Sequence, residues 1–223
     1  MMRCLVWAFC FLWIGYAESF GVADEYQVEV LEEAAPADDL SDSIAQHLNT
    51  KGLRVKRGTR TLCELWTRQH WDVVDGFEAT SEVHYPFKPG QLLGVIRFRR
   101  RGHDFRDQRL SRGIYTLRYA QQPVDGNHVG TSPTRDFLLL VRADQDESPD
   151  PMDAKRLLEA SAEAAESAHP AMMCLRKVED GNDPPSLRHD ADRDWWILRL
   201  ASKSQRDGEL LPVDLVVVGH ADE

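Results

Sequence analysis

The sequence predicts a mainly β protein: an antiparallel β-sandwich of about seven or eight strands, with one inserted α-helix and a short N-terminal helix. From Gly52 onward apolar residues recur with a period of two, which is the spacing of a strand with one buried face. The predicted strands do not alternate regularly with helices, and this disfavours a parallel α/β sheet. Roughly 200 residues follow the N-terminal segment, enough for one domain with a substantial core.

The first 23 residues predict a secretory signal peptide. Arg3 gives a positively charged start, residues 4–17 form an apolar run, and Ala17 or Ala23 offers a cleavage site. The run is shorter than the ~20 residues of a spanning helix, although an uncleaved membrane anchor is the alternative. We therefore expect a secreted or periplasmic protein with no membrane span in the mature chain.

Residues 24–40 are acidic and contain Ala and Pro. Most of this segment is predicted to be a poorly ordered lead-in, with one short strand at residues 26–31. A short helix is predicted next, because Ser41 can cap it and the apolar Ile44 and Leu48 share a face.

A single domain is predicted over residues 41–223, with strands at short apolar stretches bounded by turn residues. Residues 53–68 predict a strand pair or one bent strand, with Gly58 at the bend. Residues 113–122 alternate, and residues 134–143 are apolar on both faces, which is typical of a central strand. The other predicted strands are 92–99, 171–178, 194–202 and 211–220.

The inserted helix is predicted at residues 148–167, which have an Ala-rich body. Asp150 is the expected N-cap, and Pro151 fits the first turn. The segment between the strands at 171–178 and 194–202 is rich in turn formers and is predicted to be a loop.

The net charge of −10 argues against a general nucleic-acid binder, since such a protein needs a basic surface. The charge is uneven, because residues 97–112 contain a run of arginines. This run is either a solvated strand end and loop or an anion-binding patch.

Two cysteines, Cys63 and Cys174, follow the predicted signal peptide. In an oxidising compartment they can form a disulfide, or they can be two buried thiols, and the sequence leaves both alternatives open. No CxxC spacing is present, so neither a zinc site nor a redox dithiol is indicated.

Motifs of common enzymes are missing from the chain. It contains no GxSxG, Walker A lysine, GxGxxG or HExxH, and no histidines at HxH or HxxxH spacing. We therefore predict no metal and no cofactor, and catalysis is the minority alternative.

One polar segment, residues 123–133, joins two predicted strands and is far longer than a two-to-five-residue hairpin loop. The candidate ligand-binding residues in it and at the start of the next strand are Asp125, Asn127, His128, Arg135 and Asp136. The alternative is a long turn, in which the Asp and Asn side chains bond to their own backbone.

Four tryptophans offer stacking surfaces for sugars: Trp66, Trp71, Trp195 and Trp196. The adjacent pair must point to opposite faces of a strand, so one member is expected in the core and the other can be exposed. Core packing is also the expectation for Trp66.

Three stretches together resemble a family of uncharacterised exported bacterial proteins: "GLRVKRGTRTLCELW", "GIYTLRYAQQPVDGNHVGTSPTRDFLLL", and "HPA" after the Ala-rich helix. The element "RGIYTLR" is similar to the GxYxL strand of a wider family of β-sandwich domains of unknown function. The resemblance covers residues 41–220. It implies a fold type and an export route, and it brings no site residues.

The leading functional prediction is an exported, non-catalytic β-sandwich module that binds a small molecule, a glycan or another cell-envelope component such as an envelope protein. A hydrolase or metal-dependent enzyme that uses His128 with Asp125 or Asp136 is the first alternative. A structural or assembly protein is the second, and it would show an exposed apolar patch or edge strand.

Overall fold

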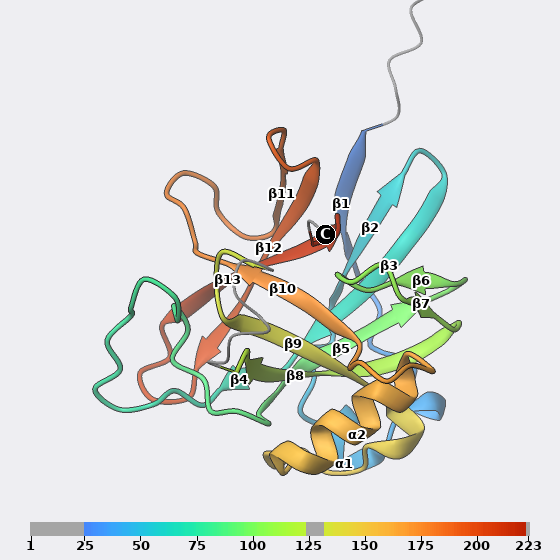
Figure 1. The fold of residues 1–223 in the computed structure, drawn as a ribbon, viewed down its shortest axis with the longest axis horizontal. Coiled ribbons are helices and arrows are strands. Elements are labelled where there is room, and N and C mark those ends of the chain that lie inside the picture. The colour runs from blue at the N-terminus through green and yellow to red at the C-terminus, as the bar shows by residue number, and fades with distance from the viewer. Residues whose placement is uncertain (1–24, 124–131, 222–223) are drawn as a thin grey trace, which may run out of the picture.

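The structure is a computed structural model, which describes residues 25–123 and 132–221. It confirms that the protein is mainly β, with a large sheet and few helices (Figure 1). The signal peptide predicted at residues 1–23 lies outside the described residues, as do three candidate site residues, Asp125, Asn127 and His128.

Eleven strands form one sheet in the order β1-β2-β3-β5-β8-β9-β10-β13-β12-β11, with β4 beside β12. Their bounds are β1 Tyr26–Leu31, β2 Gly52–Arg57, β3 Arg60–Thr67, β4 His70–Trp71, β5 Leu92–Phe98, β8 Gly113–Gln121, β9 Asp136–Arg142, β10 Met172–Arg176, β11 Ser186–Asp190, β12 Trp195–Ser204 and β13 Leu210–Val218. The sheet is mixed, since β4 runs parallel to β12. A separate antiparallel ribbon consists of β6 (Gly102–His103) and β7 (Arg109–Leu110).

The structure does not confirm a sandwich of seven or eight strands, because β10 makes the sheet continuous. Residues 172–174 of β10 pair with β9, and residues 175–176 pair with β13 on the other side. The sheet bends so that its two parts share one core, in which Leu65 of β3 and Leu200 of β12 belong to the same cluster. Its two end strands, β1 and β11, contact each other.

Four strands were missing from the prediction. β4, β6 and β7 have two residues each, too few to show any periodicity in the sequence. β11 lies in the segment predicted to be a loop because of its turn-forming residues, and it pairs with β12 along its whole length. Pairing across the sheet thus outweighs the local turn signal.

The hairpin of β2 and β3 confirms the strand pair predicted at residues 53–68. Gly58 has a φ of 57°, the left-handed conformation that favours glycine in a turn. β8 and β9 are neighbours, as expected, with Tyr115 opposite Arg142 and Gln121 opposite Asp136.

Residues 25–40 are part of the fold, in contrast to the predicted lead-in and the predicted domain start at residue 41. β1 pairs with β2 over six residues. Leu31 and Leu40 are buried in the cluster that also holds Ile44 and Trp66. The acidic composition suggested disorder, but the alternating apolar residues of β1 and these two leucines bury enough surface to order the segment.

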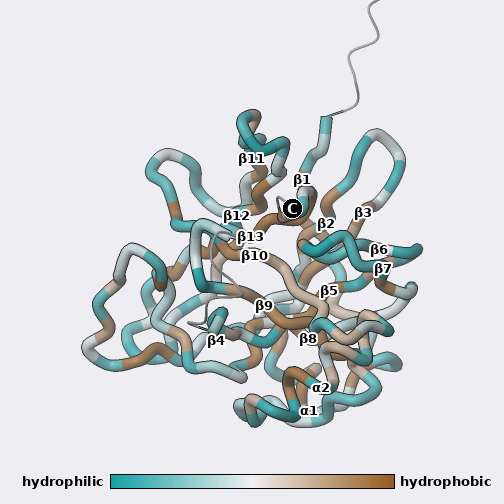
Figure 2. Tube along the Cα trace, in the orientation of Figure 1, coloured by the Kyte–Doolittle hydropathy of each residue, from teal (hydrophilic) through white to brown (hydrophobic). Residues whose placement is uncertain are grey.

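The helices cover the outer face of the sheet and lie together at its lower end (Figure 1). They are α1 (Asp42–Ala45) and α2 (Ala154–Ala164), with short 3-10 turns η1 (Ala37–Asp39) and η2 (Ala143–Gln145). Leu157 of α2 packs with Leu139 and Val141 of β9. Apolar residues follow the strands at the centre, and polar residues occupy the hairpin loops (Figure 2).

The N-cap of α2 is Asp153 and not the predicted Asp150. The Asp153 carboxylate accepts hydrogen bonds from the backbone of Lys155 and Arg156, at 3.0 and 3.3 Å. Asp150 lies in a bend that precedes the helix, and its carbonyl oxygen accepts a hydrogen bond from Nη1 of the buried Arg118 at 2.8 Å. Arg118, an arginine distant in sequence, therefore holds the segment that precedes the helix.

Cys63 and Cys174 are both buried and both free thiols. They belong to different clusters, Cys63 to the main core and Cys174 to a smaller one on the outer face beside Phe137. Of the two alternatives, the structure has the buried thiols. Burial raises the pKa of both thiols, that of Cys174 to about 11.

Candidate functional site

Asp136, one of the candidate ligand-binding residues, is buried at the first position of β9. Its Oδ1 accepts a hydrogen bond from the Tyr119 hydroxyl at 2.5 Å, and its Oδ2 accepts one from the His84 backbone at 2.8 Å. Burial raises the pKa of the Asp136 carboxyl, while these two hydrogen bonds oppose the rise. The side chain thus holds the loop at His84 against the sheet.

Arg135 points to the opposite side of the chain from its neighbour Asp136, as successive residues of an extended chain do. Its Nε donates to the carbonyl oxygen of Gln122 at 2.8 Å, and its backbone N–H donates to that of Glu82 at 2.8 Å. The two candidate residues that the structure describes are therefore not brought together into one concavity.

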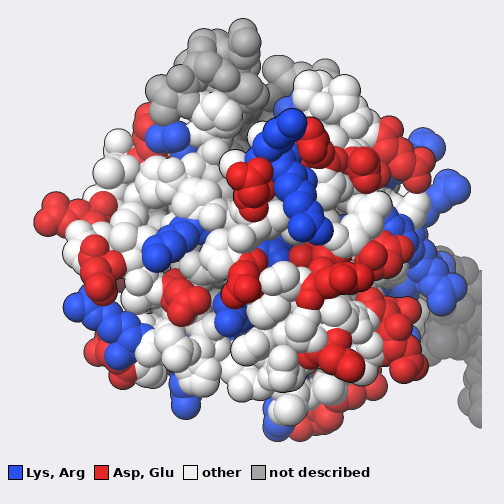
Figure 3. Space-filling view, turned by 90° about the horizontal axis from the view of Figure 1, so that it is seen from below, with Lys and Arg blue, Asp and Glu red and all other residues white. Residues whose placement is uncertain are grey.

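The arginine run at 97–112 is partly structural. Arg97 and Arg99, together with Arg54, contact the fully buried carboxylate of Glu64 at N–O distances of 2.5 to 3.0 Å. Burial opposes ionisation, yet the guanidinium groups of Arg99, Arg54 and Arg97 hold the pKa of Glu64 below its usual value. The others, Arg100, Arg101, Arg106, Arg109 and Arg112, are exposed. On the face seen from below, acidic and basic side chains are interspersed (Figure 3).

An apolar cleft lies where the two ends of the sheet come together, and we call it the seam cleft. It has a volume of about 350 Å³. Its lining residues are Val30, Asn49, Thr50, Lys51, Gly52, Leu53, Leu65, Thr67, Pro184, Pro185, Leu200, Ala201 and Leu210. Leu65 and Leu200 are buried members of the main core and form its floor. Val30 and Leu210 stand at its rim, 47 % and 59 % exposed.

The seam is closed at one end and open at the other. At the closed end Tyr26 of β1 contacts Trp196 of β12, with ring centroids 5.3 Å apart. Val30 lies on the same side of β1 as Tyr26, four residues along, so it faces the gap at the open end. The seam cleft therefore opens toward the inner face of the sheet, with the buried Leu65 and Leu200 at its floor.

A polar groove continues from the seam cleft. Its volume is about 480 Å³, and it shares Asn49, Thr50, Ala201 and Leu210 with the cleft. It adds the polar residues Gln69, His70, Ser202 and Lys203. The Gln69 amide donates to the Leu48 carbonyl at 2.9 Å, and Ser202 bonds to the backbone of residues 68 and 69. Lys203 is exposed and supplies a positive charge beside an apolar surface.

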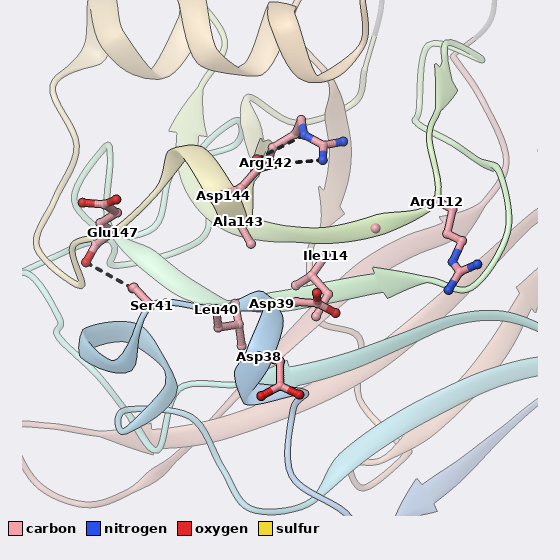
Figure 4. A pocket seen from close by; sticks show the side chains of 11 residues that line it. Asp38, Asp39, Leu40, Ser41, Arg112, Ile114, Arg142, Ala143, Asp144 and Glu147 are labelled. Atoms are coloured by element: carbon pink, nitrogen blue, oxygen red, sulfur yellow. Dashed lines mark hydrogen bonds and ion pairs between the residues drawn. The ribbon is translucent and has the colours of Figure 1, made fainter.

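A second concavity, of about 490 Å³, lies between η1 and the segment after β9 (Figure 4). Asp38 and Asp39 line one side of it, but Arg142 turns to Asp144 on its own segment, at 3.0 Å, and not to these acids. Ser41 donates to the carbonyl oxygen of Glu147 at 3.2 Å. Its one cation–carboxylate pair thus lies within a single segment, and its charged groups do not converge on a common point.

The described tryptophans are mostly core residues. Trp66, Trp71 and Trp195 are buried, which confirms the expectation for Trp66 and for one of the adjacent pair. Trp196 is half-buried between Tyr26 and His189, whose ring lies 4.7 Å away in a stacked arrangement. These four rings therefore do not form an open stacking platform.

Sequence reasoning did not find the seam cleft. Its residues come from β1, the turn at residues 49–51, β2, β3, the loop before β11, β12 and β13, most of which are far apart in the chain. In the sequence, Leu53 and Leu200 occupy the apolar positions of predicted strands and do not differ from other core residues. What distinguishes Val30 and Leu210 is that their side chains are exposed, and the sequence does not show whether an apolar side chain is exposed.

The described residues lack two further features. Within residues 25–123 and 132–221, no three His, Cys, Asp or Glu side chains are grouped so that they could hold a metal ion. No helix in the same residues has the length and apolar character needed to cross a bilayer. Neither observation bears on the residues outside these ranges.

Comparison with family models, with curated proteins and with solved structures gave no match to this chain. The resemblance to exported bacterial proteins with a GxYxL strand stays a prediction from the sequence. The fold and the geometry of the sites thus carry the functional argument.

Proposed function

We propose that this protein is an exported, non-catalytic binding module, and that the seam cleft holds the apolar part of a small amphipathic ligand. The observation that carries the proposal is the exposure of Val30 and Leu210 at the rim of an apolar cleft whose floor is formed by the buried Leu65 and Leu200. Contact between the apolar surface of an open cleft and water is unfavourable. An apolar ligand that fills the cleft removes this contact.

The size and lining of the cleft support a small-molecule ligand. A volume of about 350 Å³ is within the range of ligand pockets, which are mostly apolar with a few polar groups. Three large apolar side chains are exposed in the described residues, Val30, Leu158 and Leu210, and two of them stand at this rim. Such clustering favours a binding surface over scattered exposure.

The polar groove supports a ligand with a polar or anionic head. Lys203 carries a positive charge next to the apolar end of the groove, and His70 lies across from it in the pairing of β4 with β12. An apolar chain in the cleft would leave its head group in this polar groove. A carboxylate head is the simplest case, because it pairs with an ammonium group.

The other functional readings have less support. A glycan site needs exposed aromatic faces, and the described tryptophans pack into the protein. For the enzyme reading, Asp136 is engaged by Tyr119 and His84, whereas Asp125 and His128 lie outside the described residues. No observation favours these readings over a binding cleft.

Titration calorimetry with decanoate and with decanol tests the proposal. We expect both to bind, decanoate more tightly, because only decanoate has the anionic head. Leu210→Glu places a charge at the rim and should weaken binding about tenfold or more, since burying an unpaired charge is costly. Lys203→Gln should make the two ligands bind alike.

Leu158→Glu is the matched control for the rim variant. Leu158 is 49 % exposed, on α2, and does not line the seam cleft. Both glutamate variants alter an exposed leucine, so each should keep the stability of the protein within about 0.5 kcal/mol. Equal weakening by the two, or no binding of either ligand, would reject the site.

A further inference from the structure

Arginine side chains gather around one buried carboxylate on the outer face of the β10–β13–β12–β11 part of the sheet. The strand pairing places Arg176 opposite Asp214, and Asp214 opposite Arg199. Arg188 approaches the same carboxylate from β11. Asp214 alternates with Val213 and Leu215 of the main core, so its side chain points to the outer face.

Arg199 neutralises Asp214. Its Nε is 2.7 Å from Oδ1 and its Nη2 is 2.9 Å from Oδ2, the paired geometry of a guanidinium on a carboxylate. Its remaining donors bond to the carbonyl oxygens of Asn182 and Glu179, at 2.8 and 2.6 Å. This arginine is therefore satisfied inside the protein.

Arg188 is not satisfied in the same way. Its Nη2 lies 3.5 Å from Oδ2 of Asp214 and 3.4 Å from Oε1 of Glu179. Both contacts are ion pairs without hydrogen-bond geometry, and Nε and Nη2 of Arg188 are buried atoms with no hydrogen-bond partner. The side chain is 23 % exposed, so solvent reaches only part of it.

Arg176 has no carboxylate partner in the described residues. Its guanidinium carbon lies 5.5 Å from the centre of the Trp195 ring. Its Nε and Nη1 are buried and make no hydrogen bond. A buried guanidinium N–H without an acceptor is unfavourable, and proteins commonly satisfy such donors with water or a ligand.

The charges on this face do not balance. Arg176, Arg188 and Arg199 bring three positive charges, whereas Asp214 and the mostly exposed Glu179 bring two negative ones. The protein as a whole has a net charge of −10, so this partly buried excess of positive charge is a local feature. It favours an anion as its binding partner.

We propose that Arg176 and Arg188 form a binding site for an oxyanion. The ligand would be a carboxylate or a phosphate group, whose oxygens accept hydrogen bonds from the unpartnered Nε and Nη atoms of the two arginines. The Arg176 guanidinium lies over the face of the Trp195 ring, a contact that favours this position. This site is separate from the seam cleft and does not depend on the function proposed for it.

Binding of inorganic phosphate and of acetate, measured by titration calorimetry on the purified protein at constant ionic strength, tests the site. We expect saturable binding of at least one of them. Tighter binding of phosphate would identify a phosphate-bearing ligand, and tighter binding of acetate would identify a carboxylate. The absence of saturable binding for both anions would overturn the proposal.

Arg176→Met and Arg188→Met test the residues, because methionine keeps the apolar stem and removes the donors. Each should raise the dissociation constant of the anion about tenfold or more, as expected for the loss of charge-assisted hydrogen bonds. Arg193→Met is the matched control. Arg193 lies 5.5 Å over the same Trp195 ring, but its ion pair is with Asp190, and none of its atoms is a buried donor without a partner.

A stability measurement separates this role from a purely structural one. Without anion, the midpoint of thermal unfolding of the Arg176→Met and Arg188→Met proteins should stay equal to that of the unchanged protein or rise, because unsatisfied buried donors are removed. Phosphate or acetate should raise the midpoint of the unchanged protein and of Arg193→Met only. Lower midpoints without anion in the two variants, with anion binding unchanged, would overturn the proposal.

Discussion

Tyr26 and Trp196 join the two ends of the curved sheet. Their rings lie 5.3 Å apart at an angle of 56°, and His189 stacks on the Trp196 ring at 4.7 Å. The guanidinium of Arg57 lies 5.4 Å from the centre of the Tyr26 ring. No backbone hydrogen bond joins β1 to β11 in the described part of the chain, so side chains alone close the seam here.

Tyr26→Ala should therefore lower the free energy of unfolding by about 2 kcal/mol, through lost apolar burial and the lost aromatic pair. Urea unfolding measures the change. Gln27→Ala, at the exposed neighbouring position, should change the stability by less than about 0.5 kcal/mol. Equal effects of the two substitutions would show that the aromatic contact does not hold the seam.

Arg118→Ala should destabilise the protein strongly, by about 3 to 5 kcal/mol. Arg118 and Asp146 are both buried and paired at 2.6 and 2.7 Å, and Arg118 also donates to the carbonyl oxygens of Gly90, Ser148 and Asp150. Removing the arginine leaves an uncompensated buried carboxylate and removes a donor from three carbonyl oxygens, of which only that of Gly90 keeps another among the described residues, the Met152 backbone N–H.

Arg142→Ala is the comparison for Arg118, because Arg142 forms an exposed ion pair with Asp144 at 3.0 Å. Such pairs contribute less than about 1 kcal/mol. Guanidinium chloride is unsuited to the measurement since it screens charges, so urea is used. A loss at Arg118 no larger than that at Arg142 would contradict the role assigned to the buried pair.

The sequence predicted most strands of the sheet because their signals are local. The alternation in residues 113–122 and the glycine at position 58 are visible in a few residues, and β8 and the β2–β3 hairpin follow them. The position of the α2 start was not local. The segment before the helix is held by Arg118, which donates to the carbonyl oxygens of Ser148 and Asp150.

The sites were less accessible to prediction than the fold. Asp136 stood out as a polar residue at the start of an apolar strand, but its partner Tyr119 satisfies it inside the core. The seam cleft depends on the meeting of β1 with β11, which no pattern along the chain records. Arg176 likewise becomes notable only once the structure shows that its buried Nε and Nη1 have no hydrogen-bond acceptor.

Export should be visible at the N-terminus of the mature protein. If residues 1–23 are a signal peptide, N-terminal sequencing of the secreted product should start near Glu18 or Asp24. When the same protein is produced without an export route, it should retain residues 2–23, and only Met1 can be removed. Recovery of residues 1–17 on the exported protein would contradict cleavage.

The pH dependence of stability should report Glu64. Its pKa in the folded protein lies below the ordinary value of 4.5, because Arg99, Arg54 and Arg97 favour the charged form. The stabilisation is therefore complete above pH 4.5, and it is lost as the pH falls through the lower pKa of the folded state. Acid unfolding followed by circular dichroism from pH 7 to pH 3 measures it.

Glu64→Gln should lower the free energy of unfolding at pH 7 by about 2 kcal/mol. This is less than for a fully buried ion pair, because the arginine partners of Glu64 are partly exposed to solvent. The difference between variant and unchanged protein should shrink below pH 4.5, as the unchanged Glu64 is protonated. Glu33→Gln is the control, because the Glu33 side chain is 60 % exposed. Its Oε1 makes only long contacts with Nη2 of Arg54 and of Arg99, at 3.7 and 3.9 Å. A difference that stays constant down to pH 3 would assign the loss to packing.

The two cysteines should remain thiols that do not react in the native protein. Cys63 and Cys174 are buried in different clusters, and burial raises the pKa of Cys174 to about 11, so little thiolate forms at pH 8. In a chain that starts at residue 24, Ellman's reagent should find no fast-reacting thiol without denaturant and both thiols in urea. If they were bonded to each other, urea alone would release neither, and reduction would be needed first. Serine at either position should therefore leave the reactivity of the other cysteine unchanged, since each thiol is protected by its own surroundings and not by its partner.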